Sequence, residues 1–181
     1  MNRFRITRPL LLALALALLL LGPVQTLAES APSMFVPEFM VSTYNDDILS
    51  FLKFIKMDSD TAQAQLPFFS FELKSEEDGK LVYANTDSTL VLTYSAGSPS
   101  ETADQMTLWA NLGDESKWKN IPCIAFAYSA VVHGLDGITG DDFLHWVNDA
   151  KEDGATFETD GFSAVYAITK DVECGFTLTR K

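Results

Sequence analysis

Residues that could bind a metal are few in this chain of 181 amino acids. The two histidines, His133 and His145, show neither HxH nor HxxxH spacing, and they fall on different predicted helices. Both imidazoles would have to converge with nearby aspartates to complete a zinc site. A DxDxDG calcium loop is also absent from the sequence. We therefore expect neither a metal nor another cofactor.

Residues for nucleophilic or acid–base catalysis show no recognised arrangement. The chain has no GxSxG elbow and no SxxK signature, and its Gly79-Lys80 turn lacks the flanking residues of a phosphate loop. Paired carboxylates do occur, at Asp46-Asp47, Glu76-Glu77 and Asp141-Asp142. A glycosidase needs two carboxyl groups across one cleft, and sequence positions alone do not place any pair there. A hydrolase that uses carboxylates is therefore the weakest of three functional hypotheses.

Two cysteines, Cys123 and Cys174, allow two interpretations. In an oxidising compartment they could form a disulfide, closing a loop of about 52 residues worth roughly 4 kcal/mol in the chain-entropy model. Alternatively, both are buried thiols that pack as small apolar groups. The sequence contains no CxxC redox motif.

Aromatic residues are the remaining candidates for a binding site, since the chain has 13 Phe, 5 Tyr and 3 Trp. Trp109, Trp118 and Trp146 could stack on a sugar ring or form a surface for a partner protein. Trp118 is the best single candidate because Lys117, Lys119 and Asn120 around it are polar. Packing in the core is the simpler explanation for most of the aromatic residues.

Residues 1–28 have the three parts of a signal peptide. Three arginines precede twelve uninterrupted Leu and Ala residues, Leu10 to Leu21, and Thr26-Leu27-Ala28 suits signal peptidase. As a helix the twelve apolar residues would rise only about 18 Å, against about 30 Å of bilayer hydrocarbon, so an uncleaved anchor is the less favoured alternative. We expect a secreted, periplasmic or cell-surface protein that has no membrane span after signal cleavage.

The charge of the chain restricts its partners. The full sequence has 13 basic and 25 acidic residues, and cleavage would remove three arginines and no acid. Such an excess of negative charge repels nucleic acids and anionic membranes, so neither is an expected partner. The expected partners are another exported protein or a glycan.

Hydrophobic periodicity predicts the first half of the fold. Apolar residues at helical spacing indicate an amphipathic helix over 37–57, followed by an exposed connector over 57–65. Within that connector, TAQAQ could instead extend or restart a helix. From Leu66 the period becomes two, and a turn at Asp78-Gly79 indicates a hairpin. The expected strands are 66–74, 80–84, 89–95 and 105–110.

The stretch 121–135, IPCIAFAYSAVVHGL, has no Asp, Glu, Lys or Arg and must be buried. We predict a helix that ends at Gly134, with a buried strand as the alternative. A second helix follows Thr139, whose cap pattern pairs it with Asp142. Three strands complete the chain, at 155–159, 162–169 and 173–179.

Together these elements predict an α+β fold with helices packed on one face of an antiparallel meander sheet, in the order α-ββββ-αα-βββ. We expect a signal peptide over 1–28, a mobile leader over 29–36 and a single domain over 37–181. The favoured function is that of an exported, non-enzymatic binding or protein-interaction module. A secreted inhibitor or structural docking protein is the second hypothesis. The most informative observation would be whether the sheet face opposite the helices is bare. If that face were polar throughout and no pocket existed, both binding hypotheses would be weakened.

Overall fold

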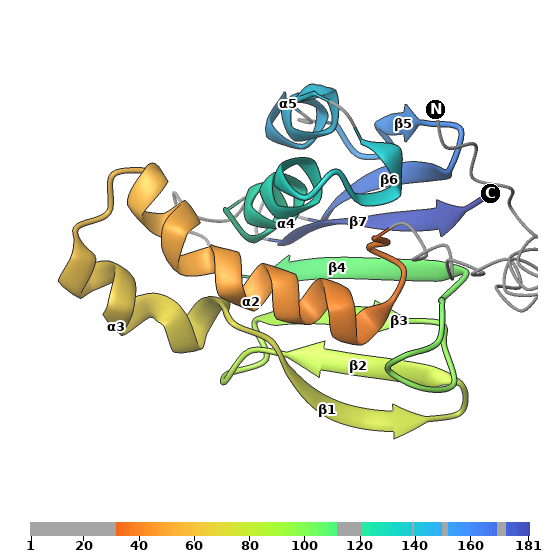
Figure 1. Ribbon diagram of the computed structural model, residues 1–181, viewed down its shortest axis with the longest axis horizontal. Coiled ribbons are helices and arrows are strands. Elements are labelled where there is room, and N and C mark those ends of the chain that lie inside the picture. Colours follow the sequence, from red (N-terminus) through yellow and green to blue (C-terminus); the bar gives the residue numbers. More distant parts are fainter. Residues whose placement is uncertain (1–31, 112–120, 139, 150–151, 170–172) are drawn as a thin grey trace, which may run out of the picture. The chain divides into compact units, whose positions relative to one another are not determined.

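The computed structural model describes residues 32–111, 121–138, 140–149, 152–169 and 173–181, and its residues from Pro32 to Lys181 form one compact unit. The α+β prediction and its element order are confirmed, with one additional helix, α3, before the first strand (Figure 1). The described elements are α2 (Pro37–Phe54), α3 (Ser59–Phe69), β1 (Glu72–Glu77), β2 (Lys80–Ala84), β3 (Leu90–Tyr94), β4 (Gln105–Asn111), α4 (Ile121–Val132), the 3-10 turn η1 (Leu135–Gly137), α5 (Asp142–Asp149), β5 (Thr156–Glu158), β6 (Phe162–Thr169) and β7 (Glu173–Arg180).

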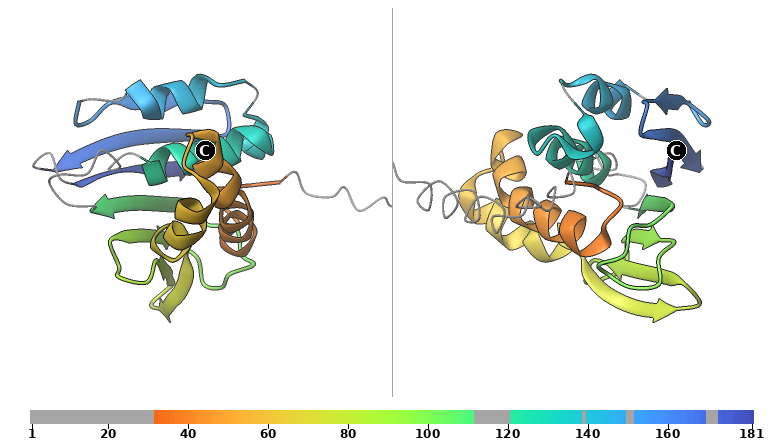
Figure 2. Two further views of the ribbon diagram at one scale, coloured as in Figure 1. Left: turned by 90° about the vertical axis from the view of Figure 1, so that its left-hand side faces the viewer. Right: turned by 45° about the vertical axis from the view of Figure 1, so that its right-hand side comes forward.

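The described strands form one seven-stranded antiparallel sheet in the order β1-β2-β3-β4-β7-β6-β5. Its two meanders meet where β4 pairs with β7, from Gln105 opposite Thr179 to Asn111 opposite Glu173. Helices α2, α4 and α5 all lie over the same face of the sheet (Figures 1 and 2). The main core lies between these two layers, because the sheet and the helices each bury one apolar face there.

Helix α2 is the predicted amphipathic helix. Pro37 occupies its first turn, where a missing backbone N–H costs nothing. Met40, Tyr44, Ile48 and Phe51 recur at helical spacing and are buried against the sheet. The 3.6-residue period therefore predicted both the helix and the side that it buries.

The segment after α2 differs from the prediction. Residues 59–69 form helix α3 instead of a connector and the start of a strand, and Asp58 caps it by accepting a hydrogen bond from the Thr61 amide at 3.0 Å. The strand starts only at Glu72, after Phe71 exchanges two backbone hydrogen bonds of 2.9 Å with the Asn45 side chain on α2. The predicted turn is present, since Asp78 and Gly79 have φ of 52° and 70°, as a tight hairpin requires.

The prediction of a mobile leader over 29–36 is wrong for the described part, residues 32–36. Met34 and Phe35 are fully buried in the core. The carboxylate of Asp136 in η1 accepts hydrogen bonds from the Ser33 hydroxyl at 2.7 Å and from the Met34 amide at 2.8 Å. The Asp136 amide in turn donates to the Pro32 carbonyl at 3.1 Å. This segment is held by a contact some hundred positions away, which local sequence does not reveal.

Helix α4 confirms that the charge-free stretch is a buried helix. Cys123, Phe126, Ala127 and Ala130 have no exposed surface, and Gly134, with φ of 60°, follows the helix end. The long charge-free run is explained by its position between α2, α5 and the sheet.

The suggested disulfide is not present, and the buried-thiol alternative describes the structure. Cys123 on α4 and Cys174 on β7 are both buried and are not joined. A hydrogen bond with the Cys174 thiol, together with burial, raises the pKa of Cys123 well above its usual value. Both cysteines thus contribute to the packing between helix and sheet.

We expect alkylation of Cys123 and Cys174 by iodoacetamide to be at least about a hundredfold slower in the native protein than in denaturant, because burial withholds the reactive thiolate. Mass spectrometry of time points taken at neutral pH measures both rates. Native thiols that react at the unfolded rate, or an intact mass lower by two hydrogens without reductant, would contradict this expectation.

Candidate functional site

The first candidate is the face of the sheet opposite the helices. In Figure 2 the helices lie on one side of the sheet, and no described segment lies over the other side. The side chains on this open face include a row across five strands. The row consists of Val82, Thr93, Thr107, Thr177 and Val165, which the strand pairing places side by side.

The centre of the open face is the pair of strands β4 and β7. Three of their four outward cross-strand pairs are joined by side-chain hydrogen bonds. The Gln105 amide donates to the Thr179 hydroxyl at 3.3 Å, the hydroxyls of Thr107 and Thr177 lie 3.0 Å apart, and the Asn111 amide donates to Glu173 at 2.8 Å. In the remaining pair Trp109 is opposite Gly175. We call these eight residues the β4–β7 ladder.

Trp109 is the only tryptophan among the described residues on the open face, and it is partly exposed there. A Cβ atom on Gly175 would lie 2.8 Å from Cε3 of Trp109, so the indole ring packs against bare backbone. Its other lateral neighbour is Val91 on β3, and Ala167 lies beyond Gly175 on β6. Small residues on β7 and β6 therefore flank the indole on that side.

The charge on the ladder is low for so acidic a protein. Glu173 is its single ionisable residue, and its carboxylate is already hydrogen-bonded to Asn111. Further along the open face, Glu158 forms an ion pair with Lys181 at 2.5 Å. The ladder is thus a mainly neutral polar strip with one aromatic ring.

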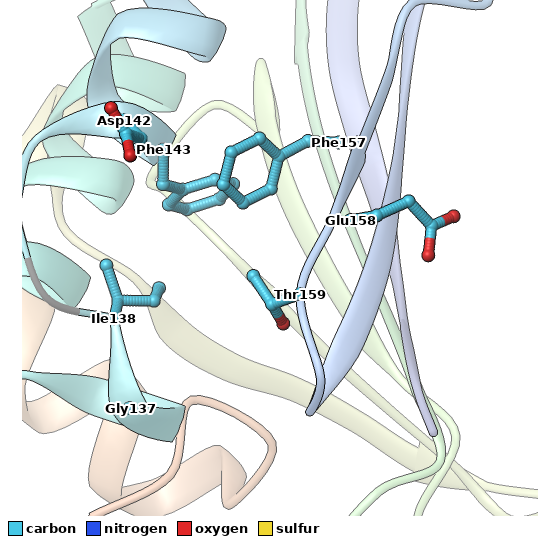
Figure 3. A pocket seen from close by; sticks show the side chains of 7 residues that line it. All are labelled: Gly137, Ile138, Asp142, Phe143, Phe157, Glu158 and Thr159. Carbon is cyan, nitrogen blue, oxygen red and sulfur yellow. The ribbon is translucent and has the colours of Figure 1, made fainter.

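A second candidate is a hollow of about 250 Å³ between η1, α5 and β5, shown in Figure 3. The rings of Phe143 and Phe157 lie together in it, with centroids 5.4 Å apart, while the Glu158 carboxylate points away. The Thr159 hydroxyl accepts hydrogen bonds from the backbone of its own turn, at Gly161 and Phe162. The lining of the hollow is therefore mixed, with the polar residues Asp142, Glu158 and Thr159 beside the two rings.

The structure describes two of the three predicted binding aromatics and places them in different surroundings. Trp109 lies on the open face, whereas Trp118 lies outside the described residues. Trp146 packs with Phe143, Phe157 and Tyr166 at centroid distances of 5.8, 5.7 and 6.0 Å, which favours the packing explanation for it. The sequence analysis named none of the ladder's threonines as binding residues. Threonine is common in strands, so its presence there does not indicate a binding site.

The histidines have separate partners. His133 lies 3.0 Å from Asp47, and His145 lies 2.8 Å from Asp141, one turn earlier in the chain. Within the described ranges, no group of three His, Cys, Asp or Glu side chains could hold a metal ion. None of the helices described has the length and hydropathy that a membrane span requires.

Comparisons with protein-family models, with curated proteins and with solved structures found no match to this chain. Its function is therefore inferred from the chemistry of its own residues.

Proposed function

We propose that this protein is an exported, non-enzymatic binding module whose ligand lies on the open face of the sheet. The observation that carries the proposal is the β4–β7 ladder, in which Trp109 is flanked by polar side chains that are already hydrogen-bonded to one another. Side chains held in this way lose little conformational freedom when a ligand binds, so more of the contact energy appears as affinity. Export is supported by the signal-like residues 1–28.

Two aspartates, Asp58 and Asp87, have pKa values shifted in the direction that does not suit a general acid. A general acid that works near neutral pH needs a raised pKa. Hydrogen bonds from Thr61 and Thr89 instead lower the pKa values of Asp58 and Asp87, which serve as a helix cap and a turn residue. Near the hollow, Glu158 points away and is paired with Lys181.

A docking protein or inhibitor is the second candidate, and one observation favours it. On the helix side, Phe54 is 69% exposed and stacks on Tyr128 at 5.9 Å, while Val132 is 55% exposed. We call these three residues the helix-side patch. Isolated exposed apolar side chains are common on soluble proteins, so this patch supports docking less strongly than the ladder supports binding.

Binding arrays of glycans and exported proteins, probed with one variant of each surface, test the proposal. The ladder variant combines Trp109→Ala with Thr177→Arg, and the patch variant combines Phe54→Ser with Val132→Ser. We expect wild-type protein to bind at least one class of ligand, with affinity reduced at least about tenfold in the ladder variant. The patch variant should retain that affinity.

Circular dichroism and thermal unfolding check that both variants remain folded. Binding lost only in the patch variant would replace the proposal with the docking function. Binding that survives both sets of substitutions, or no binding to any arrayed class, would refute the assignment to the open face.

A further inference from the structure

We infer that the ligand of the open face is a neutral glycan chain, which lies along the β4–β7 ladder with one sugar ring against Trp109. This inference rests on the proposed function and adds the chemical class of the ligand. Four features of the ladder support it: hydrogen-bonding capacity, the aromatic ring, length and charge.

The ladder can form further hydrogen bonds while its internal bonds remain in place. A threonine hydroxyl has one donor and two acceptor sites, so the Thr107–Thr177 bond leaves one donor and three acceptor sites unused. Among the hydrogen bonds between described residues, the side-chain amides of Gln105 and Asn111 each use one N–H, and each amide carries a second. Sugar hydroxyls also donate and accept, and this mixed, uncharged surface is complementary to them.

Trp109 supplies the apolar contact that such a ligand needs. One face of a sugar ring exposes mainly C–H groups, which pack on the face of an indole, while the ring hydroxyls point sideways to polar neighbours. Thr107 and Asn111 are the adjacent outward residues on β4, before and after Trp109. The aromatic ring is thus placed within a polar strip and not at the centre of an apolar patch.

The length and shape of the strip suit an extended polymer. Outward positions on a strand are about 6.8 Å apart, so the four from Gln105 to Asn111 span about 20 Å. Side chains of one sheet face form a shallow surface.

The position of the ladder in the sheet disfavours a peptide that binds as an added strand. Such a peptide pairs with an edge strand, whereas β4 and β7 are both interior strands.

The charge of the ladder favours a neutral glycan over charged polymers and over a second copy of the chain. Recognition of sulfate, phosphate or carboxylate groups uses Arg or Lys, and the ladder contains neither. A second copy of the chain placed on this face would bring its own Glu173 and the excess of negative charge close to the first. A neutral glycan needs no Arg or Lys for its recognition, and the negative charge of the protein does not repel it.

The test measures binding of the full mature protein to soluble β-glucan, hydroxyethyl cellulose and dextran, beside heparin, polygalacturonate, chitosan oligomers and arrayed exported proteins. We expect a neutral polysaccharide to bind and heparin and polygalacturonate not to bind.

Trp109→Ala should weaken the binding of the neutral polysaccharide at least about tenfold, and Trp109→Phe should weaken it less. Thr107→Val with Thr177→Val should weaken it severalfold while leaving the ring in place. Phe68→Ala, which removes an exposed ring on α3 outside both surfaces, is the matched control and should bind like wild type.

Fluorescence gives a readout at Trp109 itself. Because the chain has three tryptophans, a variant with Trp118→Phe and Trp146→Phe retains Trp109 alone. Addition of the bound polysaccharide should shift its emission to the blue and protect it from acrylamide. A core role for Trp109 alone would produce neither change.

The possible failures are distinguishable. Binding that depends on Trp109 but is confined to proteins or chitosan overturns the neutral-glycan inference and leaves the proposed function intact. Neutral-polysaccharide binding that is unchanged in Trp109→Ala overturns the placement on the ladder. Absence of binding in every class overturns both.

Discussion

Replacing Gly175 with alanine is expected to lower the free energy of unfolding by about 3 kcal/mol, at the upper end of ordinary overpacking costs. A Cβ atom on Gly175 would overlap the carbonyl oxygen of Leu108 and crowd the ring of Trp109. The Leu108 carbonyl belongs to the β4 backbone, which cannot retreat without disturbing its pairing with β7. Urea denaturation measures the effect.

Gly161→Ala is the matched control for this experiment. Its added Cβ would make only ordinary contacts, the nearest at 3.7 Å, so we expect a change within about 0.5 kcal/mol. Adding Trp109→Ala to Gly175→Ala should not restore stability, because the clash with the Leu108 carbonyl remains. Full rescue by that second substitution would show that the ring alone requires the glycine.

Replacing Asp136 with alanine should cost about 4 kcal/mol, from two hydrogen bonds to a carboxylate at about 1.5 kcal/mol each and about 1 kcal/mol of backbone strain. The carboxylate holds the Ser33 hydroxyl and the Met34 amide, and Asp136 itself has φ of 49°. Loss of this contact should release the segment that buries Met34 and Phe35. Denaturant unfolding gives the free energy, and hydrogen exchange at residues 34 and 35 reports the release.

Two further substitutions separate the hydrogen bonds from the backbone. Asp136→Gly removes the acceptors but relieves the positive φ, so it should cost less than alanine. Asp136→Asn tolerates this backbone conformation and retains one acceptor, so its cost should be about half that of alanine. If all three variants unfold like wild type, residues 32–36 are not held by Asp136.

The sequence predicted the fold class because its signals act over short distances. The helical period in α2 and the charge-free run of α4 report which side chains are buried, and burial is the main source of helix stability in a protein. Prediction failed at α3, where Phe69 and Phe71 imitate the alternation of a strand. In the structure Phe69 ends the helix and Phe71 is held by Asn45 on α2, a contact that spans 26 positions.

The candidate site was only partly visible in the sequence. Trp109 could be named as an aromatic in a strand, but nothing local indicated that it lies opposite a glycine, on the face that the described helices do not cover. Its setting depends on the pairing of β4 with β7, whose side-chain hydrogen bonds join residues 62, 70 and 74 positions apart.

Sequence alone determined the types and order of most elements, since periodicity, helix starts and turn residues act within a few positions of the chain. Tertiary structure decided which strands are neighbours, which sheet face the described helices leave open, that Met34 and Phe35 are buried, and that Cys123 and Cys174 meet as thiols. The physical reason is that each of these features depends on contacts between residues far apart in the chain. The proposed binding surface belongs to this second group.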